Sequence, residues 1–108
     1  FVDQNKPQLV DWLSGCFMIV ERSFFEKVKG FDERFFLYFE DVDICRMAKD
    51  HNKKVLYDPT QTISHIGKFE SAKKKGILNS VLTNPASRMH LISWLKYIIK
   101  WRVDYFFY

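Results

Sequence analysis

The sequence predicts a small mixed α/β fold. Short apolar runs of strand length occur in the first 65 residues, and segments with helical periodicity lie between them. The 108 residues include 47% hydrophobic and 28% charged side chains, a globular rather than a disordered composition. A complete doubly wound sheet needs more strands than these, so we expect the chain to be one part of a larger α/β fold.

Four short segments are predicted to be extended. Residues 9–13 and 16–20 flank a Ser-Gly turn, and the second is an uninterrupted apolar run typical of a buried strand. Residues 54–57 and 61–65 flank a turn-forming Asp-Pro pair. We therefore expect a sheet in the first two thirds of the chain.

Three segments are predicted to be helical. The first starts near residue 21 and ends before Gly30, because glycine commonly follows the last residue of a helix. The second covers residues 40–51, where apolar residues recur at spacings of three and four and acids occupy the first turn. The last covers residues 85–104 and follows an Asn-Pro pair suited to start a helix.

Aromatic residues make up 18% of the chain, with eleven Phe, five Tyr and three Trp. A core of this size does not enclose so much ring surface, so part of it should face a partner and favour self-association. Residues 31–39 hold many of these rings and have neither the period of a helix nor that of a strand. We expect another part of the structure to cover this aromatic loop.

Cys16 and Cys45 are the only cysteines, and their spacing is neither that of a CxxC motif nor that of a zinc site. We expect two buried, unreactive thiols in a reducing compartment. No run of 18 uncharged apolar residues is present, which argues against a membrane-spanning helix. The chain starts without Met or a signal-like segment and is expected to be a piece of a longer, cytoplasmic protein.

The net charge of +4 is unevenly distributed. Residues 1–50 hold 10 acidic and 7 basic side chains, whereas residues 51–108 hold 3 and 10. The basic run at residues 73–75 makes nucleic-acid binding one alternative, but the acidic cluster at residues 32–43 argues against it. We therefore expect no nucleic-acid partner.

Glu40, Asp41 and Asp43 form the first candidate site. Acidic side chains in the first turn of a helix interact favourably with its dipole, which is the structural interpretation. The functional interpretation is a general base beside an aromatic wall, because partial desolvation raises the pKa of a carboxyl group towards the range that a base needs. Position alone leaves both interpretations open.

His65 follows an apolar segment and precedes a glycine, where a side chain is presented beside an open loop. It is either a structural residue or a metal ligand, and a ligand would need at least two partners. The nearest acids along the chain are those at residues 40–43. His51 and His90 show no partner pattern and are interpreted as structural or surface residues.

Four ordered motifs resemble the second half of a family 2 inverting glycosyltransferase, and its rhamnosyltransferase-like bacterial members in particular. The motifs are WLSGCFMIV at 12–20, GFDERFFLYFEDVDICR at 30–46, VLYDP at 55–59 and HIG at 65–67. The resemblance covers roughly residues 9–71 and implies the C-terminal part of a GT-A, Rossmann-like fold. Residues 1–71 would then be the acceptor-side catalytic half, and residues 72–108 a basic linker and an amphipathic helix.

The resemblance also implies an activity. Such enzymes transfer a sugar from a nucleotide-sugar donor to a saccharide or lipid-linked acceptor with inversion, in the synthesis of cell-surface polysaccharides. The Glu-Asp pair of the family places the general base at Asp41, with Glu40 as an orienting neighbour or the less favoured base. Trp12, Ser14 and Gly15 match a segment that lines the sugar site.

Further site residues follow from the same resemblance. Asp43 and Arg46 are assigned to the substrate-binding region, where they would hold the catalytic turn together. In some relatives a histidine after the next strand joins acidic ligands on a divalent metal, which maps to His65 and to Mg²⁺ or Mn²⁺. The nucleotide-binding half is expected to lie outside this chain, so we expect the isolated chain to be inactive.

The last predicted helix has an unusual composition. Ser93, Tyr97, Lys100 and Asp104 recur at spacings of four, three and four and make one polar strip. The rest is mostly apolar or aromatic with added basic residues, as in helices that lie at a membrane surface. We expect a peripheral position at the inner face of the plasma membrane, with packing on the other half or on another subunit as the alternative. A non-catalytic membrane-surface or protein-interaction module is the alternative function.

Overall fold

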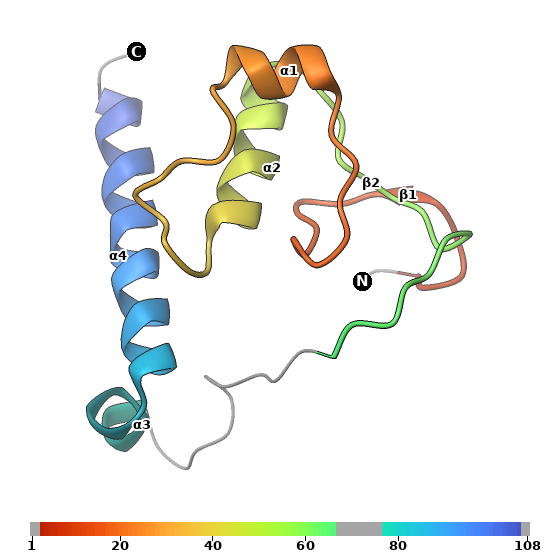
Figure 1. Ribbon diagram of the computed structural model, residues 1–108. Helices are drawn as coiled ribbons and strands as arrows, with labels where there is room; N and C mark the ends of the chain where they lie inside the picture. Colours follow the sequence, from red (N-terminus) through yellow and green to blue (C-terminus); the bar gives the residue numbers. More distant parts are fainter. Residues whose placement is uncertain (1–2, 67–76, 107–108) are drawn as a thin grey trace. The chain divides into compact units, whose positions relative to one another are not determined.

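The computed structural model describes residues 3–66 and 77–106 and shows, within these ranges, four helices and one two-stranded sheet (Figure 1). This mixed architecture agrees with the predicted α/β class. The described residues form two compact units, 3–32 with 40–66 and 33–39 with 77–106, and each is treated separately below. The predicted boundary between residues 71 and 72 and the basic run at 73–75 lie outside the described residues.

The sheet of the first unit consists of two short strands. Strand β1 (Gln8–Leu9) pairs antiparallel with β2 (Leu56–Tyr57). The backbone N–H of Val10 donates to the carbonyl oxygen of Val55 at 3.0 Å, so the backbone hydrogen bonding between the two segments continues for one residue beyond the strands. The predicted extended segments at 9–13 and 54–57 are therefore confirmed in a shorter form, and their pairing with each other was not predicted.

Residues 16–20 and 61–65 were predicted to be strands, and this prediction is wrong. Neither segment has strand structure in the part of the chain that the structure describes. A strand requires a neighbour that takes up its backbone hydrogen bonds, and no ladder to these segments is present among the described residues. Ile19 is consequently 88% exposed and Ile63 50% exposed, whereas Met18 and Val20 pack partly against the core.

The two helices of the first unit agree with the prediction. Helix α1 (Arg22–Lys27) is followed by Gly30, whose φ is +75° and whose N–H donates to the Phe25 carbonyl at 2.8 Å. Helix α2 (Glu40–Asp50) begins with three acids in its first turn. Helix α1 lies across one end of α2 (Figure 1), where the Phe24 and His51 rings meet edge to face at 5.8 Å between centroids.

The core of the first unit is small and joins both helices to the chain beside the sheet. Its buried members are Phe24 from α1, Ile44 and Cys45 from α2, and Val55 next to β2. Burying one such aliphatic side chain contributes about 1.5–3 kcal/mol to the free energy of unfolding. Burial of these apolar side chains therefore holds α2 against α1 and against the segment next to β2.

The two cysteines differ from the prediction of two buried thiols. Cys45 is buried and free, and burial raises the pKa of its thiol, which agrees with an unreactive group. Cys16 is free but exposed, because the segment that contains it is not an enclosed strand. The prediction thus holds for Cys45 and is wrong for Cys16.

The second unit contains helix α3 (Ile77–Thr83), which was not predicted, and the long helix α4 (Pro85–Phe106), which confirms the predicted last helix. Asn84 starts α4, since its side-chain oxygen accepts the Ala86 N–H at 3.0 Å. None of the helices within the described ranges has the length and apolar character needed to cross a membrane.

Helix α4 covers residues 33–39 of the predicted aromatic loop 31–39, although incompletely; these seven residues are called loop 33–39 below. Phe35 of the loop and Trp101 of α4 are buried, whereas Phe36 is 83% exposed. The polar strip of α4 is part of the packed face, because Ser93 is only 2% exposed and donates a hydrogen bond to the loop. The apolar residues Ile92, Leu95 and Ile99 of the same helix are 45%, 46% and 61% exposed.

Candidate functional site

Asp41 lies in the first turn of α2 and is hydrogen-bonded to the predicted sugar-site turn. One of its carboxylate oxygens, Oδ2, accepts the backbone N–H of Gly15 at 2.9 Å, and the other, Oδ1, accepts the N–H of Val42 at 2.8 Å. Backbone donors fix the orientation of the carboxylate while each oxygen retains a further acceptor site. The structure thereby brings together two residues that the sequence predicted for one site, 26 positions apart.

The close approach of the chain at Gly15 to Asp41 does not require a glycine at this position. A Cβ atom added at Gly15 would lie 3.4 Å from Asp41 Cβ and 3.7 Å from Asp41 Oδ2, which is ordinary van der Waals contact. The backbone N–H, rather than the missing side chain, therefore makes the specific contact with Asp41.

Glu40 precedes Asp41 and has a different environment. Its Oε2 atom is buried and has no hydrogen-bond partner among the described residues. Burial raises the pKa of Glu40, the charge of Asp41 raises it further, and a backbone hydrogen bond partly offsets both effects. The sequence predicted partial desolvation of this acidic group in general but did not indicate that Glu40 would carry the unpartnered oxygen.

Asp43 and Arg46 occupy the same helix. Asp43 is completely buried, so its contacts lie within the protein, and its predicted role in holding the catalytic turn together stays a prediction. Arg46 is half-buried. The structure does not place Asp43 where a substrate would touch it.

Trp12 and Ser14 lie next to Gly15 and are accessible. Trp12 is 52% exposed, and the Ser14 hydroxyl accepts the N–H of Cys16 at 3.5 Å. An exposed indole and hydroxyl beside a fixed carboxylate present a ring face and a polar group, which are the groups that bind sugars. The predicted sugar-site residues and the predicted base thus share one region of the first unit.

His65 is exposed and lies in irregular chain. No group of three or more His, Cys, Asp or Glu side chains suited to hold a metal ion occurs within the described parts of the chain. A metal site that includes His65 would therefore need ligands beyond those that the described residues place together.

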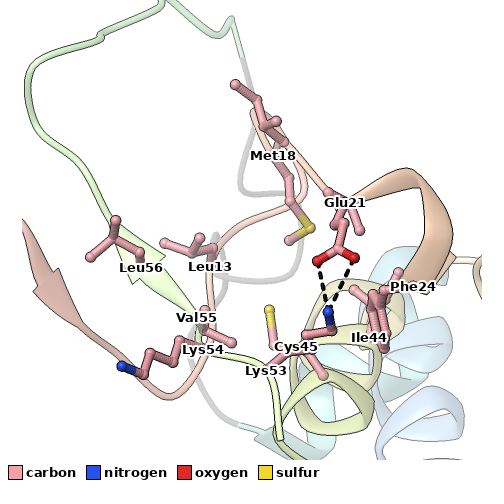
Figure 2. A pocket seen from close by; sticks show the side chains of 13 residues that line it. Leu13, Met18, Glu21, Phe24, Ile44, Cys45, Lys53, Lys54, Val55 and Leu56 are labelled. Atoms are coloured by element: carbon pink, nitrogen blue, oxygen red, sulfur yellow. Dashed lines mark hydrogen bonds and ion pairs between the residues drawn. The ribbon is translucent and has the colours of Figure 1, made fainter. Parts of the chain in front are cut away.

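The first unit also contains a largely apolar cavity of about 390 Å³, which was not predicted. Figure 2 shows the side chains of Leu13, Met18 and Cys45 around it. Lys53 donates to both carboxylate oxygens of Glu21 at this cavity, at 2.8 and 3.1 Å, and this contact lowers the pKa of Glu21. Asp41 and Glu40 do not line the cavity, so it is separate from the carboxylate site.

A mixed α/β chain with a carboxylate fixed beside an accessible turn, the predicted sugar-site turn, is compatible with a carbohydrate-active protein. Comparison with known proteins agrees with this class. The chain is 32% identical over 95 residues to the rhamnosyltransferase WbbL of Escherichia coli strain K12, covering 88% of this chain and 33% of the relative. This similarity supports a relation of the chain to rhamnosyltransferase-like glycosyltransferases.

Two further relatives come from Mycobacterium tuberculosis, strains CDC 1551/Oshkosh and ATCC 25618/H37Rv. Both are named N-acetylglucosaminyl-diphospho-decaprenol L-rhamnosyltransferase and are 43% identical over 56 residues, 52% of this chain and 18% of each relative. The chain thus spans about a third or less of the length of these relatives. No protein-family profile and no solved structure matches it.

Proposed function

We propose that this chain is the acceptor-side catalytic part of a family 2, GT-A glycosyltransferase that acts with inversion in cell-surface polysaccharide synthesis. The observation that carries the proposal is the hydrogen bond between Gly15 N–H and Asp41 Oδ2, because it joins two separate motifs of the resemblance. The similarity to a rhamnosyltransferase over 88% of the chain supports the same conclusion.

Asp41 acts as the general base in this proposal. The hydroxyl group of an acceptor sugar is a very weak acid and loses its proton as its oxygen attacks the anomeric carbon of the donor. The new bond joins that oxygen to the anomeric carbon, and the bond to the nucleoside diphosphate breaks on the opposite face. Asp41 takes the proton, and its two backbone donors hold the carboxylate in a constant orientation while it does so.

The donor is a nucleotide sugar and the acceptor is a saccharide or a lipid-linked saccharide. The mycobacterial relatives are named for an L-rhamnose transfer to a lipid-linked N-acetylglucosamine diphosphate. We propose that the same classes of donor and acceptor apply here, with Trp12 and Ser14 on the sugar. His65 would supply one imidazole ligand to a Mg²⁺ or Mn²⁺ ion whose other ligands lie outside the described residues.

Two measurements test this function. A full-length transferase that contains this sequence should transfer sugar from one member of a panel of UDP- and dTDP-sugars that includes a rhamnosyl donor. The isolated 108-residue chain should show no transfer and no binding of these sugars by calorimetry, because the donor half is not within it. Saturable micromolar binding by the isolated chain would contradict its assignment to the acceptor side.

Peripheral membrane binding is a second function that a specific observation favours. Helix α4 exposes Ile92, Leu95 and Ile99 and has four basic and no acidic residues between Pro85 and Arg102. An exposed apolar face with cations beside it suits the inner, anionic face of the plasma membrane. A lipid-linked acceptor would then lie in the same plane as the enzyme.

Vesicle sedimentation separates this function from packing on another protein surface. The full-length enzyme should bind vesicles that contain anionic lipid, and truncation after Asn84 should weaken this without loss of donor binding. Equal binding with and without residues 85–108 would show that α4 only packs against protein. Exposed apolar surface also favours self-association of the isolated chain, which light scattering would detect as a dimer or larger species.

A further inference from the structure

Two consecutive aromatic residues of loop 33–39 have an unusual backbone conformation. Tyr38 has φ of +67° and Phe39 has φ of +69°, both in the left-handed region that glycine favours. Bulky residues rarely adopt it, because their Cβ atom then approaches the neighbouring carbonyl oxygen. Such conformations persist only where surrounding contacts hold them, and they gather at functional sites. Glu40 follows Phe39 directly in the sequence.

Helix α4 supplies the contacts that hold this backbone. Ser93 Oγ donates to the carbonyl oxygen of Leu37 at 2.5 Å. The His90 ring lies edge-on to Tyr38 and to Phe39, with centroids 5.0 and 5.4 Å away. His90 and Ser93 are three positions apart, so they lie on the same side of the helix.

Two further contacts of α4 extend this packing along the loop. The Tyr97 ring lies 5.4 Å from Phe39, and Lys96 Nζ donates to the Arg34 carbonyl oxygen at 3.0 Å. Tyr97 is four positions after Ser93 and continues the same side of the helix. Both ends of the loop are therefore in contact with α4.

The residues that α4 buries against the loop are not those expected if the packing served only to remove apolar area from water. The helix buries a serine to 2% exposure while Ile92 and Ile99 remain 45% and 61% exposed. Packing for apolar area alone would place these isoleucines inside and the serine outside. A buried hydroxyl is stable only with a partner, and here that partner is a loop carbonyl.

We propose that His90, Ser93 and Tyr97 are positioning residues for the transfer reaction, because they fix the backbone of the two residues bonded directly before Glu40. The link to chemistry rests on the proposed function, whereas the contact itself does not. The three residues touch neither donor nor acceptor in this proposal. They act by maintaining a strained backbone at the entry to the Glu40-Asp41 turn.

Hydrogen exchange of the 108-residue chain tests the contact itself. Ser93→Ala should raise the exchange rate of amides in residues 37–41 roughly tenfold, because one buried hydrogen bond that holds the loop is lost. Ile92→Ala, which removes an exposed side chain of the same helix, is the control and should leave these amides unchanged. Unchanged exchange at 37–41 in Ser93→Ala overturns the proposal. If Ser93→Ala unfolds, the same comparison between His90→Ala and His90→Phe decides, because phenylalanine retains the ring contact.

Kinetics of the full-length transferase tests the link to catalysis. His90→Ala should lower kcat about tenfold with little change in donor KM, because misplacement of catalytic groups affects the chemical step. His90→Phe should restore most of kcat. If kcat falls in parallel with the melting temperature in all variants, and His90→Phe does not restore kcat, the positioning role is overturned. If the wild type transfers sugar from none of the donors, the proposed function is refuted instead. The hydrogen-exchange result would then still show whether α4 holds the backbone of loop 33–39.

Discussion

Asp41→Asn separates the chemical role of this residue from its structural role. The carboxylate accepts two backbone N–H groups, one on each oxygen, whereas an asparagine amide offers only one oxygen. One of the two hydrogen bonds is therefore lost. A hydrogen bond to a charged group contributes about 1.5–3 kcal/mol when it is well shielded, and the accessible position of the Gly15 contact places the loss below this range, at about 1 kcal/mol.

The expected loss of activity is much larger than this loss of stability. Removal of a general base lowers kcat by roughly a hundred- to ten-thousand-fold. A loss of about 1 kcal/mol lowers the melting temperature by only about 4–8 °C in a domain of this size. Steady-state transfer by the full-length enzyme, together with thermal melting, therefore distinguishes a missing base from a loosened fold.

Glu40→Gln and Gly15→Ala are the controls. Glu40→Gln should reduce kcat less than Asp41→Asn, because Glu40 is assigned as an orienting neighbour. Gly15→Ala retains the N–H donor and adds a methyl group at 3.4 Å from Asp41 Cβ, so kcat should stay within a few-fold of the wild type. Near-normal turnover of Asp41→Asn with loss of activity in Glu40→Gln would refute the reasoning and move the base by one residue.

Three further predictions follow from the site and its surroundings. The pKa of Glu40 is raised in the folded chain, so the folded state binds more protons and stability falls as pH rises from about 4 through the raised pKa. Glu40→Gln should therefore have a higher urea midpoint of unfolding than the wild type at pH 7, and the difference should shrink towards pH 4; a constant difference would contradict a raised pKa. One thiol of the native chain, Cys16, should react rapidly with a thiol reagent while Cys45 reacts only on unfolding, and equal rates would contradict the burial of Cys45. His65→Ala should weaken the response of transfer to Mn²⁺ with unchanged melting, whereas a large fall in melting temperature without a metal effect would make His65 structural.

Three of the four helices in the described ranges, α1, α2 and α4, were predictable because their signals are local. Gly30 ends the turn after α1 through its own positive φ, and Asn84 starts α4 through its own side chain, so neither depends on distant contacts. The strands were less predictable, because an apolar run is extended only where a partner completes its ladder. Residues 16–20 have strand composition and find no such partner among the described residues.

The candidate site was predictable in position but not in detail. Acids in the first turn of a helix mark the place, and the turn at Ser14 and Gly15 was expected near it. The sequence does not distinguish the two neighbouring carboxylates, because their difference arises from contacts across 26 residues and from burial. Asp41 is held by backbone donors, whereas Glu40 retains a buried oxygen without a partner in the described chain.

Helix α4 shows why composition alone did not indicate which side of a helix packs. Its polar strip was visible in the sequence, but a strip of serine and tyrosine suits either water or a loop that offers carbonyl groups and rings. The loop has both, and it takes Ser93 and Tyr97, which leaves Ile92, Leu95 and Ile99 accessible. The loop contact and the proposed membrane contact therefore use different residues of one helix. Variants at Ser93 and at Ile99 should then affect loop protection and vesicle binding separately.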